Sequence, residues 1–380
     1  MTEAQQSEKE KNIRMIDIAR LANLSVATVS VALRGEEGVK PETRHKVLRL
    51  ARQYNYRPNL QAQSLRLQKT RRVAMILPEL ENLFLIEKLR LAREIFWTEG
   101  YEVSFSCTNW DPDTEKEVTE YFLAQQVDAL IISQVSGREV DHLEEFCAKG
   151  KPVCVIGPLP RSFQNMISIQ TDLCGGMAQA VRLLLGFGHR YFGTVGINPN
   201  LIARREGIAM ALREAGLQEQ ESVLHIPCSG PHLHQGREAM SLFIRQQGSA
   251  ALPSAVLAVN DDVAIGIIAA LEEHGLEVPR DVSVVGCDNI KFAAYVKPPL
   301  TTVSQSAGKL GRLAAKLVLE QLQSGKRGSR YIQEPTELVV RQSTGPPKSG
   351  GKRIEEIPLK GLTESNCNYQ KEDVPMKENN

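Results

Sequence analysis

Three short segments near the start of the chain carry apolar residues at helical spacing. The first covers residues 15–22 and ends at Asn23, a residue type that tolerates the left-handed backbone of a tight turn. Ser25 is a favourable N-cap for the second segment, and Pro41 opens the third, which runs to residue 56. The predicted apolar stripes are Ile18, Ala19 and Ala22; Val26, Val29 and Leu33; and Val47, Leu48, Ala51 and Tyr54. Two helices joined by a turn of about three residues, and closed by a third helix, form an all-α helix-turn-helix layout.

From Val73 the pattern changes to short runs rich in Val and Ile, separated by amphipathic stretches. The predicted strands lie at residues 73–77, 103–107, 129–133, 153–157, 167–169, 192–196, 254–259 and 282–286, and the predicted helices include 83–99, 174–187, 202–215 and 261–274. Continuous apolar strands with helices of about 10–15 residues between them indicate parallel sheets covered on both faces. The number of units predicts an α/β core of two doubly wound parallel-sheet lobes, with a ligand in the cleft between them.

The remaining segments are polar and interrupt these two patterns. Residues 1–11 and 345–380 are predicted to be disordered, since they hold too few apolar residues for a packed core. Residues 58–72 are predicted to form a basic linker that contains a short helix-compatible run. That run of about eight residues is too short to be a stable helix in isolation, so it is expected to be helical only under some conditions. The predicted organisation is therefore a headpiece over 12–57, a hinge helix or linker over 58–72, and a core over 73–344.

Composition narrows the class of protein. The chain of 380 residues is 42% hydrophobic and 24% charged, which is ordinary for a soluble globular protein. No apolar run approaches the roughly 20 residues of a membrane helix, and the polar N-terminus does not resemble a signal peptide. Seven scattered cysteines without a CxxC pair favour a reduced, cytoplasmic location over a disulfide or zinc framework.

Charge is distributed unevenly along the chain. Residues 1–72 hold 15 Lys and Arg against 7 Asp and Glu, a balance of +8, whereas the remainder holds 31 against 38, a balance of −7. A small basic unit attached to an acidic body is the charge distribution of a polyanion-binding head. A solvated basic face explains the charge alone equally well.

Ordered motifs along the chain make the interpretation more specific. They are 17-DIARLANLSVATVS-30, 40-KPETRHKVLRLARQYNYRPN-59, 78-PELENLF-84, 188-GHR-190, 204-RREG-207, 260-NDDVAIG-266, 279-PRDVSVVGCDN-289 and 298-PPLTTVSQ-305. With these motifs the sequence resembles the lactose-repressor (LacI/GalR) family of bacterial transcription regulators from about residue 13 to 344. The resemblance implies a core like that of periplasmic binding proteins and an effector between its lobes. It also implies a near-palindromic DNA operator and a homodimer, with a tetramer as the alternative.

The resemblance places the DNA-contacting residues in the second helix and the hinge. Ser25 and Thr28 offer hydroxyls to phosphates at the start of the helix, and Arg34 lies at its end. Val26, Ala27 and Val31 take the outward positions, where the family usually carries base readers and often an arginine at the position of Val31. Valine and alanine make only apolar contacts, chiefly with the thymine methyl group, so a guanine-centred half-site is not expected.

In the family, a leucine of the hinge helix wedges into the minor groove when two headpieces occupy the operator. Leu65 matches this position, Ala62 one turn earlier permits close approach of two helices, and Asn59 closes the second motif. A flexible linker is the alternative for this segment.

Candidate effector residues also follow from the resemblance. Arg204 and Asp261 match pocket residues of the family, since a guanidinium and a carboxylate bind hydroxyl groups. Asp261 is also a candidate helix N-cap, as is Asp172. Asn82 and Phe84 match a loop lining the cleft, and Phe84 is equally acceptable as a core residue. His232 and His234 could bind the ligand; as metal ligands they lack recognisable partners, so no metal is predicted.

Rival functions find less support. A solute-binding transport protein would share the core but not the headpiece. The nucleophile elbow, P-loop lysine motif, HExxH and Rossmann glycine fingerprint are all missing from the sequence, so neither catalytic residues nor a cofactor are predicted. A sugar is the expected effector and a nucleobase or nucleoside the alternative. The effector either releases the protein from DNA or tightens its binding, since both responses occur in the family.

Overall fold

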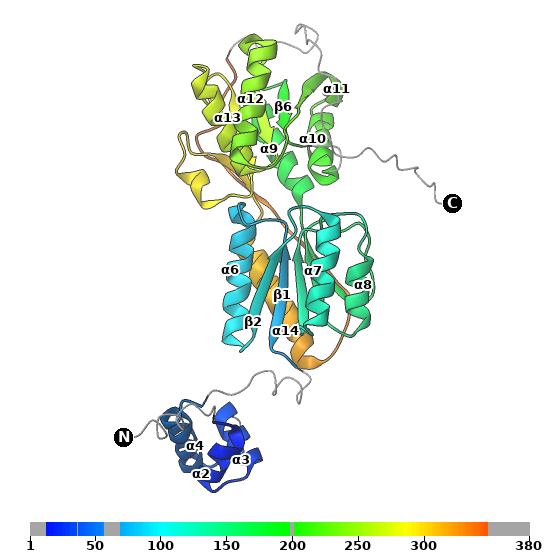
Figure 1. Ribbon diagram of the computed structural model, residues 1–380. Helices are drawn as coiled ribbons and strands as arrows, with labels where there is room; N and C mark the ends of the chain where they lie inside the picture. The colour runs from blue at the N-terminus through cyan, green and yellow to red at the C-terminus, as the bar shows by residue number, and fades with distance from the viewer. Residues whose placement is uncertain (1–12, 36, 57–68, 198–200, 349–380) are drawn as a thin grey trace, which may run out of the picture. The chain divides into compact units, whose positions relative to one another are not determined.

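The computed structural model describes residues 13–35, 37–56, 69–197 and 201–348. The chain divides into two compact units, Met1–Thr70 and Arg71–Asn380, whose described parts are called the headpiece and the core (Figure 1). Predictions for residues 1–11, for most of the hinge including Asn59, Ala62 and Leu65, and for the tail beyond residue 348 lie outside the described residues.

The headpiece consists of helices α2 (Met15–Ala22), α3 (Val26–Arg34) and α4 (Pro41–Gln53). Asn23 ends α2 with a left-handed φ of 54°, and the side chain of Ser25 caps α3, as predicted. The axes of α2 and α3 differ by 104°, within the usual range for a helix-turn-helix. These local signals therefore establish the predicted layout.

The headpiece core is built mainly from the predicted apolar stripes. Ile18, Ala22, Val29 and Val47 are almost completely buried, and the ammonium of Lys46 donates to the carbonyl of Ala22 at the end of α2 (2.8 Å). Two stripe assignments are wrong. Val26 is 40% exposed, because Val29 and Ala32 supply the packed face of α3. Tyr54 is exposed because α4 ends at Gln53, one residue before it.

Lobe 1 of the core is a six-stranded parallel sheet in the order β11-β5-β4-β3-β1-β2. Its strands are β1 (Arg72–Leu77), β2 (Glu102–Cys107), β3 (Ala129–Ser133), β4 (Val153–Ile156), β5 (Met166–Thr171) and β11 (Arg330–Glu334). Its helices are α6 (Leu83–Thr98), α7 (Pro112–Ala124), α8 (Asp141–Ala148) and α14 (Ala307–Ser324). Helices α6 and α14 cover one face of the sheet, and α7 and α8 cover the other (Figure 1).

Lobe 2 is a six-stranded sheet in the order β12-β10-β9-β8-β6-β7, with only β12 antiparallel to its neighbour. Its strands are β6 (Phe192–Val195), β7 (Val223–Ile226), β8 (Ala255–Ala258), β9 (Ser283–Cys287), β10 (Thr301–Ser304) and β12 (Glu337–Val339). Its helices are α9 (Leu173–Phe187), α10 (Ile202–Glu214), α11 (Glu219–Ser222), α12 (Leu233–Gln247) and α13 (Asp261–Glu273), with 3-10 turns η2 (Ser249–Ala251) and η3 (Lys291–Ala294).

The prediction of two doubly wound lobes is thus confirmed, but four strands were missed. They are β7, β10, β11 and β12, which are short, rich in polar residues or partly exposed. Their pairing with a neighbouring strand, rather than a run of Val and Ile, makes them strands.

The chain passes between the two lobes three times, after β5, β10 and β11. The hydroxyl of Thr171 donates to the Gln305 amide oxygen (2.7 Å), and the backbone N–H of Asp172 donates to the carbonyl of Glu334 (2.9 Å). Asp172 also caps α9 through the N–H of Gly175, as predicted. The three crossings are therefore tied to one another at the boundary between the lobes.

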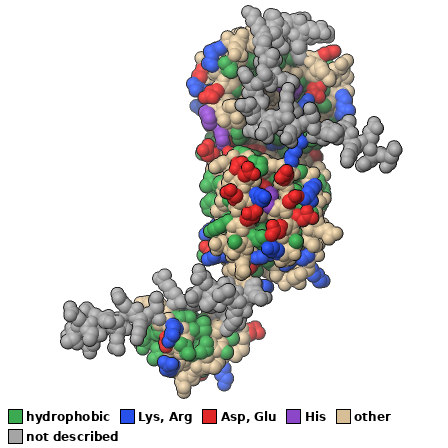
Figure 2. All heavy atoms as spheres, turned by 45° about the vertical axis from the view of Figure 1, so that its right-hand side comes forward, with side chains coloured by type: hydrophobic (Ala, Val, Ile, Leu, Met, Phe, Trp, Pro, Cys, Tyr) green, Lys and Arg blue, Asp and Glu red, His purple; other side chains and the backbone are tan. Residues whose placement is uncertain are grey.

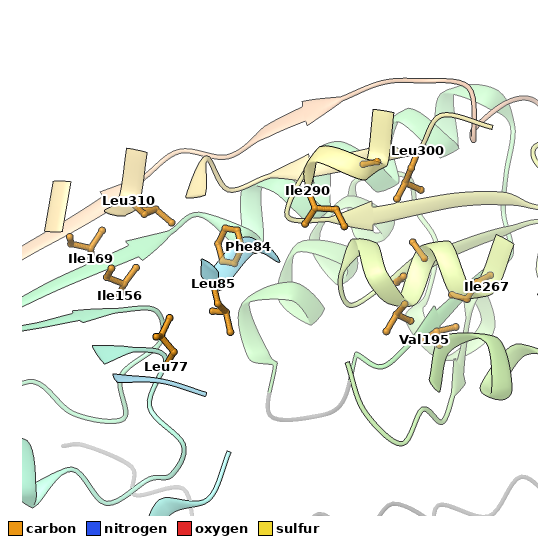
Figure 3. Close-up of a cluster of buried hydrophobic side chains, with 14 of the residues drawn as sticks. Leu77, Phe84, Leu85, Ile156, Ile169, Val195, Ile267, Ile290, Leu300 and Leu310 are labelled. Atoms are coloured by element: carbon orange, nitrogen blue, oxygen red, sulfur yellow. The ribbon is translucent and has the colours of Figure 1, made fainter. Parts of the chain in front are cut away.

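Alternate side chains of β1 face opposite layers of lobe 1, as expected for a strand buried on both faces. Val73, Met75 and Leu77 belong to a large apolar cluster, and Ala74 and Ile76 belong to a separate one. The large cluster continues into lobe 2, and Figure 3 shows Phe84 lying between side chains of the two lobes. Packing of the lobes against each other thus uses the same apolar cluster that stabilises each sheet.

Two of the sequence motifs have structural explanations. A Cβ on Gly207 would lie 2.2 Å from the carbonyl oxygen of Cys174, so glycine is required for the close approach of α9 and α10. His189 is buried, with its ring nitrogens 2.8 Å from Ser254 Oγ and 2.8 Å from the carbonyl oxygen of Gly345. It therefore joins lobe 2 to the last described segment.

Within the described ranges, no single helix is long and apolar enough to cross a membrane. Helices α2 and α3 reach the required length and apolar content only when they are counted together, and they are bent by 104° relative to each other.

Candidate functional site

The first candidate site is the N-terminal end of α3. The Ser25 hydroxyl accepts from the N–H of Thr28 (3.0 Å) and lies 2.8 Å from the Thr28 hydroxyl. Both hydroxyls thus lie beside the first-turn N–H groups, where the positive end of the helix dipole favours an anion. The arrangement suits a phosphate group of a nucleic acid.

The outward face of α3 is apolar. Val26 and Ala27 are exposed and Val31 is half-buried, whereas Ser30 is buried in the headpiece. Arg34 is the last residue of the helix. The predicted reading positions are therefore accessible at Val26 and Ala27, and they can contact a base only through methyl groups.

The second candidate site lies between the lobes, at the carboxyl ends of β9 and β10. The Gln305 side-chain amide donates to an Asp288 carboxylate oxygen (2.5 Å) and lies 3.8 Å from Cys287 Sγ. Arg204 approaches the same sulfur through a terminal nitrogen (4.0 Å), while its Nε is buried without a hydrogen-bond partner. Arg204 therefore lies near Cys287 and Asp288, and its role in binding an effector stays a prediction.

A buried cation from lobe 1 faces this group. Burial lowers the pKa of the Lys88 ammonium to about 7, against the opposing effect of the charge on Asp288. Burial likewise raises the pKa of Asp288 to about 6, although Arg204, Gln305 and Lys88 all favour its charged form. The Lys88 ammonium also lies 4.2 Å from the centre of the Phe84 ring. The two lobes therefore interact electrostatically through Lys88 and Asp288.

Asp261 plays a structural part in this arrangement. Its side chain is fully buried, and its oxygens accept from the N–H of Ile290 (2.8 Å) and the hydroxyl of Thr302 (2.5 Å). Burial raises the pKa of this carboxyl well above its ordinary value. The N-cap of α13 is Asn260 and not Asp261, so the alternative N-cap prediction was one residue off. Asp261 holds the chain after β9 in place and presents no exposed atom to a ligand.

Asn82 and Phe84 are likewise engaged within lobe 1. Asn82 is the N-cap of α6 and accepts from the N–H of Phe84 (2.9 Å). Phe84 is buried in the apolar cluster between the lobes, with the Lys88 ammonium over its ring. These contacts favour the core alternative for Phe84.

His232 contacts lobe 1 across the boundary. Its ring nitrogens lie 3.4 Å from a Glu79 oxygen and 3.7 Å from a Glu81 oxygen, and its ring stacks on that of His234. Glu79 also accepts from the indole N–H of Trp110 (3.1 Å). Burial raises the pKa of the adjacent Asp262 carboxyl. The charge of Glu79 raises this pKa further, whereas that of His232 lowers it.

Sequence reasoning missed Glu79, Lys88, Asp288 and Gln305 as members of this site. Glu79, Asp288 and Gln305 follow the carboxyl ends of β1, β9 and β10, so the strand-end rule could have identified them. Lys88 gave no signal, because a lysine in an amphipathic helix is normally solvated.

Comparison with known proteins identifies the chain. Residues 14–59 match "Bacterial regulatory proteins, lacI family" and residues 181–344 match "Periplasmic binding protein-like domain". Catabolite control protein A of Priestia megaterium is 30% identical over 338 residues, which cover 88% of this chain and 99% of that protein.

Two solved structures share the fold. One is a LacI family regulator from Enterococcus faecium with bound ribose, with a TM-score of 0.66 and 26% identity, covering 73% of this chain and all of that one. The other is the lac repressor dimer bound to operator and an anti-inducer, with a TM-score of 0.75 and 24% identity, covering 88% of this chain and all of that one. The described relatives are transcriptional regulators and not enzymes, and the chain belongs to the lacI family of bacterial regulatory proteins.

Proposed function

We propose that this DNA-binding transcriptional regulator is a cytoplasmic repressor whose affinity for its operator is set by a small effector, a sugar, bound between the lobes of the core. The observation that carries the proposal is the exposed face of α3, which combines two hydroxyls at the helix start with an apolar outward surface. Such a helix can anchor on phosphates and read thymine methyl groups in the major groove.

The charge distribution supports binding to a polyanion. The first 72 residues carry a balance of +8, whereas the rest of the chain carries −7. Figure 2 shows acidic side chains gathered on a face of lobe 1. A basic headpiece favours DNA, and the acidic body disfavours nonspecific contact elsewhere.

A homodimer is the expected assembly. Trp97 of α6 is 63% exposed, and Phe105 is exposed on β2, which is an edge strand of its sheet. Large apolar side chains that are left uncovered in one chain favour burial against a second copy. Two identical headpieces would then recognise the two halves of a near-palindromic operator.

The effector is proposed to lie beside Arg204, Asp288 and Gln305. Arg204 Nε lacks a partner, and a buried donor without a partner is costly, so a ligand acceptor there would stabilise the site. Similarity to the ribose-bound regulator favours a sugar over the alternative, a nucleobase or nucleoside. Binding to both lobes would change their orientation and thereby the operator affinity.

Operator selection from a random DNA library, using the full-length chain, tests the DNA-binding part. We expect half-sites rich in A·T pairs and a steep fall of affinity with salt concentration. Thr28→Val, which keeps the shape but removes a hydroxyl, should weaken binding uniformly across sequences. A strong guanine requirement that survives Arg34→Ala would contradict the proposed reading by α3.

A further inference from the structure

We propose that Arg71 is a positioning residue for operator binding. Its contacts hold the chain in one conformation at the junction between the predicted hinge and the core, and specific binding depends on that fixed starting point. The division into two compact units falls between Thr70 and Arg71, and β1 begins at the next residue, so Arg71 is the first residue of the core. The inference goes beyond the proposed function and rests on one part of it, the recognition of a two-part operator by two headpieces.

The backbone of Arg71 has a left-handed conformation. Its φ is 53°, in a region that residues other than glycine, asparagine and aspartate rarely adopt, because the Cβ comes too close to the following carbonyl oxygen. Such a residue keeps this conformation only where its surroundings impose it, and residues of this kind gather at ligand clamps and switch regions. The junction therefore needs contacts that hold it.

Both backbone polar groups of Arg71 are bonded to the neighbouring strands. Its N–H donates to a carboxylate oxygen of Asp128, just before β3 (2.8 Å), and its carbonyl accepts from the N–H of Glu102, the first residue of β2 (2.8 Å). The N–H of Asp128 donates in turn to the carbonyl of Arg72 (2.7 Å). The junction is thus fixed at the amino ends of three adjacent strands, because β1 lies between β2 and β3.

The Arg71 side chain adds a second set of contacts, to the turn between α6 and β2. The guanidinium donates to the carbonyl of Glu99 at the end of α6 (3.2 Å) and lies 5.6 Å from the centre of the buried Tyr101 ring. A cation is favoured at both places, by the free carbonyls of a helix end and by the face of an aromatic ring. Gly100 leaves room for the guanidinium, since a Cβ there would lie 3.2 Å from its Nη1.

The neighbouring Arg72 provides a contrast. Its guanidinium approaches Glu102 at 3.6 Å in an ion pair whose side chains are 42% and 61% exposed, so the pair contributes little to stability. Two consecutive arginines beside a DNA-binding unit would both be expected to bind phosphates. The Arg71 guanidinium is instead engaged by the core, and these contacts favour a positional role.

A fixed junction matters more for specific than for nonspecific binding. Two headpieces must meet half-sites at one spacing, so any conformational freedom at the junction is lost when the operator is bound and lowers the affinity. Nonspecific binding depends mainly on phosphate charges and needs no fixed spacing. Because Arg71 is exposed, its contacts should contribute less to core stability than to this preorganisation.

The test compares binding of the full-length chain to its selected operator and to a scrambled duplex of equal length, at several salt concentrations. Arg71→Gly is the decisive variant, since glycine adopts the left-handed backbone without strain but lacks the side-chain anchor and frees the junction. We expect operator affinity to fall about tenfold, whereas affinity for the scrambled duplex should change little. Core unfolding in urea, followed by tryptophan fluorescence, should be nearly unchanged.

Further variants separate positioning from charge. Arg71→Lys keeps the charge but loses the planar guanidinium that fits both Glu99 and Tyr101, so operator affinity should fall here as well. Asp128→Ala removes the acceptor of the Arg71 N–H and should reproduce the loss independently, whereas Asp128→Asn, which keeps an acceptor oxygen, should restore most of the affinity. Arg72→Ala is the matched control. It removes the same charge one position along the chain and should change affinity for the two duplexes equally and slightly.

Operator affinity that is unchanged in both Arg71→Gly and Asp128→Ala would overturn the inference. So would equal losses on the two duplexes together with a shallower dependence of affinity on salt, because that pattern belongs to a direct phosphate contact. The preference of the wild-type chain for its operator is measured first. If the wild type had none, the proposed function would be contradicted, whereas a preference that both variants retain in full refutes only the role of Arg71.

Discussion

The two candidate sites of this chain use opposite physical means. The outward face of α3 is an exposed, largely apolar surface with hydroxyls at one end. It belongs to a small unit of three helices. The site between the lobes is a buried set of charged groups, drawn from both sheets and held by hydrogen bonds. An exposed side chain that contacts DNA can be substituted without affecting the fold, whereas removing a buried charged side chain leaves its partners unpaired and destabilises the fold.

The contrast predicts that substitutions on the outward face of α3 can change the preferred DNA sequence without changing the fold of the core. Residues such as Val26 and Ala27 contribute little to the headpiece core, which rests on Ile18, Val29 and Val47. In the core, however, Asp288, which we propose lies beside the effector, is close enough to the structural carboxylate of Asp261 to raise its pKa. Substitutions there should therefore alter stability and binding together.

The largest expected effect is at Asp261. Asp261→Ala leaves the Ile290 N–H and the Thr302 hydroxyl without an acceptor in a buried place, so the core should lose about 3 kcal/mol or more of unfolding free energy. Both tryptophans, Trp97 and Trp110, lie in the core, so urea unfolding followed by tryptophan fluorescence reports on it alone. Asp261→Asn, which keeps one acceptor, should lose less. Equal stability of wild type and the alanine variant would contradict the structural role.

The next effect is a pH dependence from Lys88. Its folded pKa of about 7 lies below the ordinary 10.5, so the unfolded chain binds more protons between these values and stability should rise with pH across this window. Between pH 7 and 9 the rise attributable to Lys88 should be of the order of 1–3 kcal/mol. Asp288 adds no slope in that window, because its pKa of about 6 lies below it. Urea unfolding at pH 7, 8 and 9 should show the rise in wild type and not in Lys88→Met.

In the headpiece, Val31→Arg should change the preferred DNA sequence and not the fold. An arginine at this outward, half-buried position can donate to guanine, which is worth about 1–3 kcal/mol of discrimination between bases. Core unfolding should be unaffected, since the substitution lies in the other unit. Selection of half-sites by the two chains in parallel is the measurement. Identical selected sequences would show that position 31 does not face the bases.

The smallest expected effect is at Ser25. Ser25→Ala removes the cap on α3 and should cost about 1 kcal/mol, seen as faster amide hydrogen exchange in the first turns of that helix. Ser25→Asp preserves a capping oxygen but places a negative charge where a phosphate is expected. It should therefore keep the exchange protection yet weaken DNA binding. Equal DNA affinity for wild type and the aspartate variant would argue against a phosphate at this helix end.

Much of the headpiece was predictable because its signals are local. The turn at Asn23, the cap at Ser25 and the proline that opens α4 each act within a few residues, and the structure has all three. The exceptions, Val26 and Tyr54, lie at a helix start and just past a helix end, where helical spacing does not determine burial.

The site in the core was only partly predictable. The motif predicts Arg204 as a ligand-binding residue, and the structure places it near Cys287, beside the pair formed by Asp288 and Gln305. Its contact with a ligand stays a prediction. Asp261 was chosen by the same reasoning, yet its carboxylate turns inward to Ile290 and Thr302. Adjacent acidic residues in a motif do not reveal which one is buried, since that depends on segments about 30 and 40 positions away.

The sequence by itself determined the two kinds of unit, the alternation of strands and helices in the core, and the family to which the chain belongs. Periodicity, caps and motif order are sufficient for these because each depends on neighbouring residues. Only the tertiary structure decided that Lys88 is buried opposite Asp288, and that Glu79 and Arg204 each keep an unpartnered atom. A side chain is buried, and finds its hydrogen-bond and charge partners, where segments distant in the sequence meet. The free energy of a charged group depends on these surroundings and not on its neighbours in the chain.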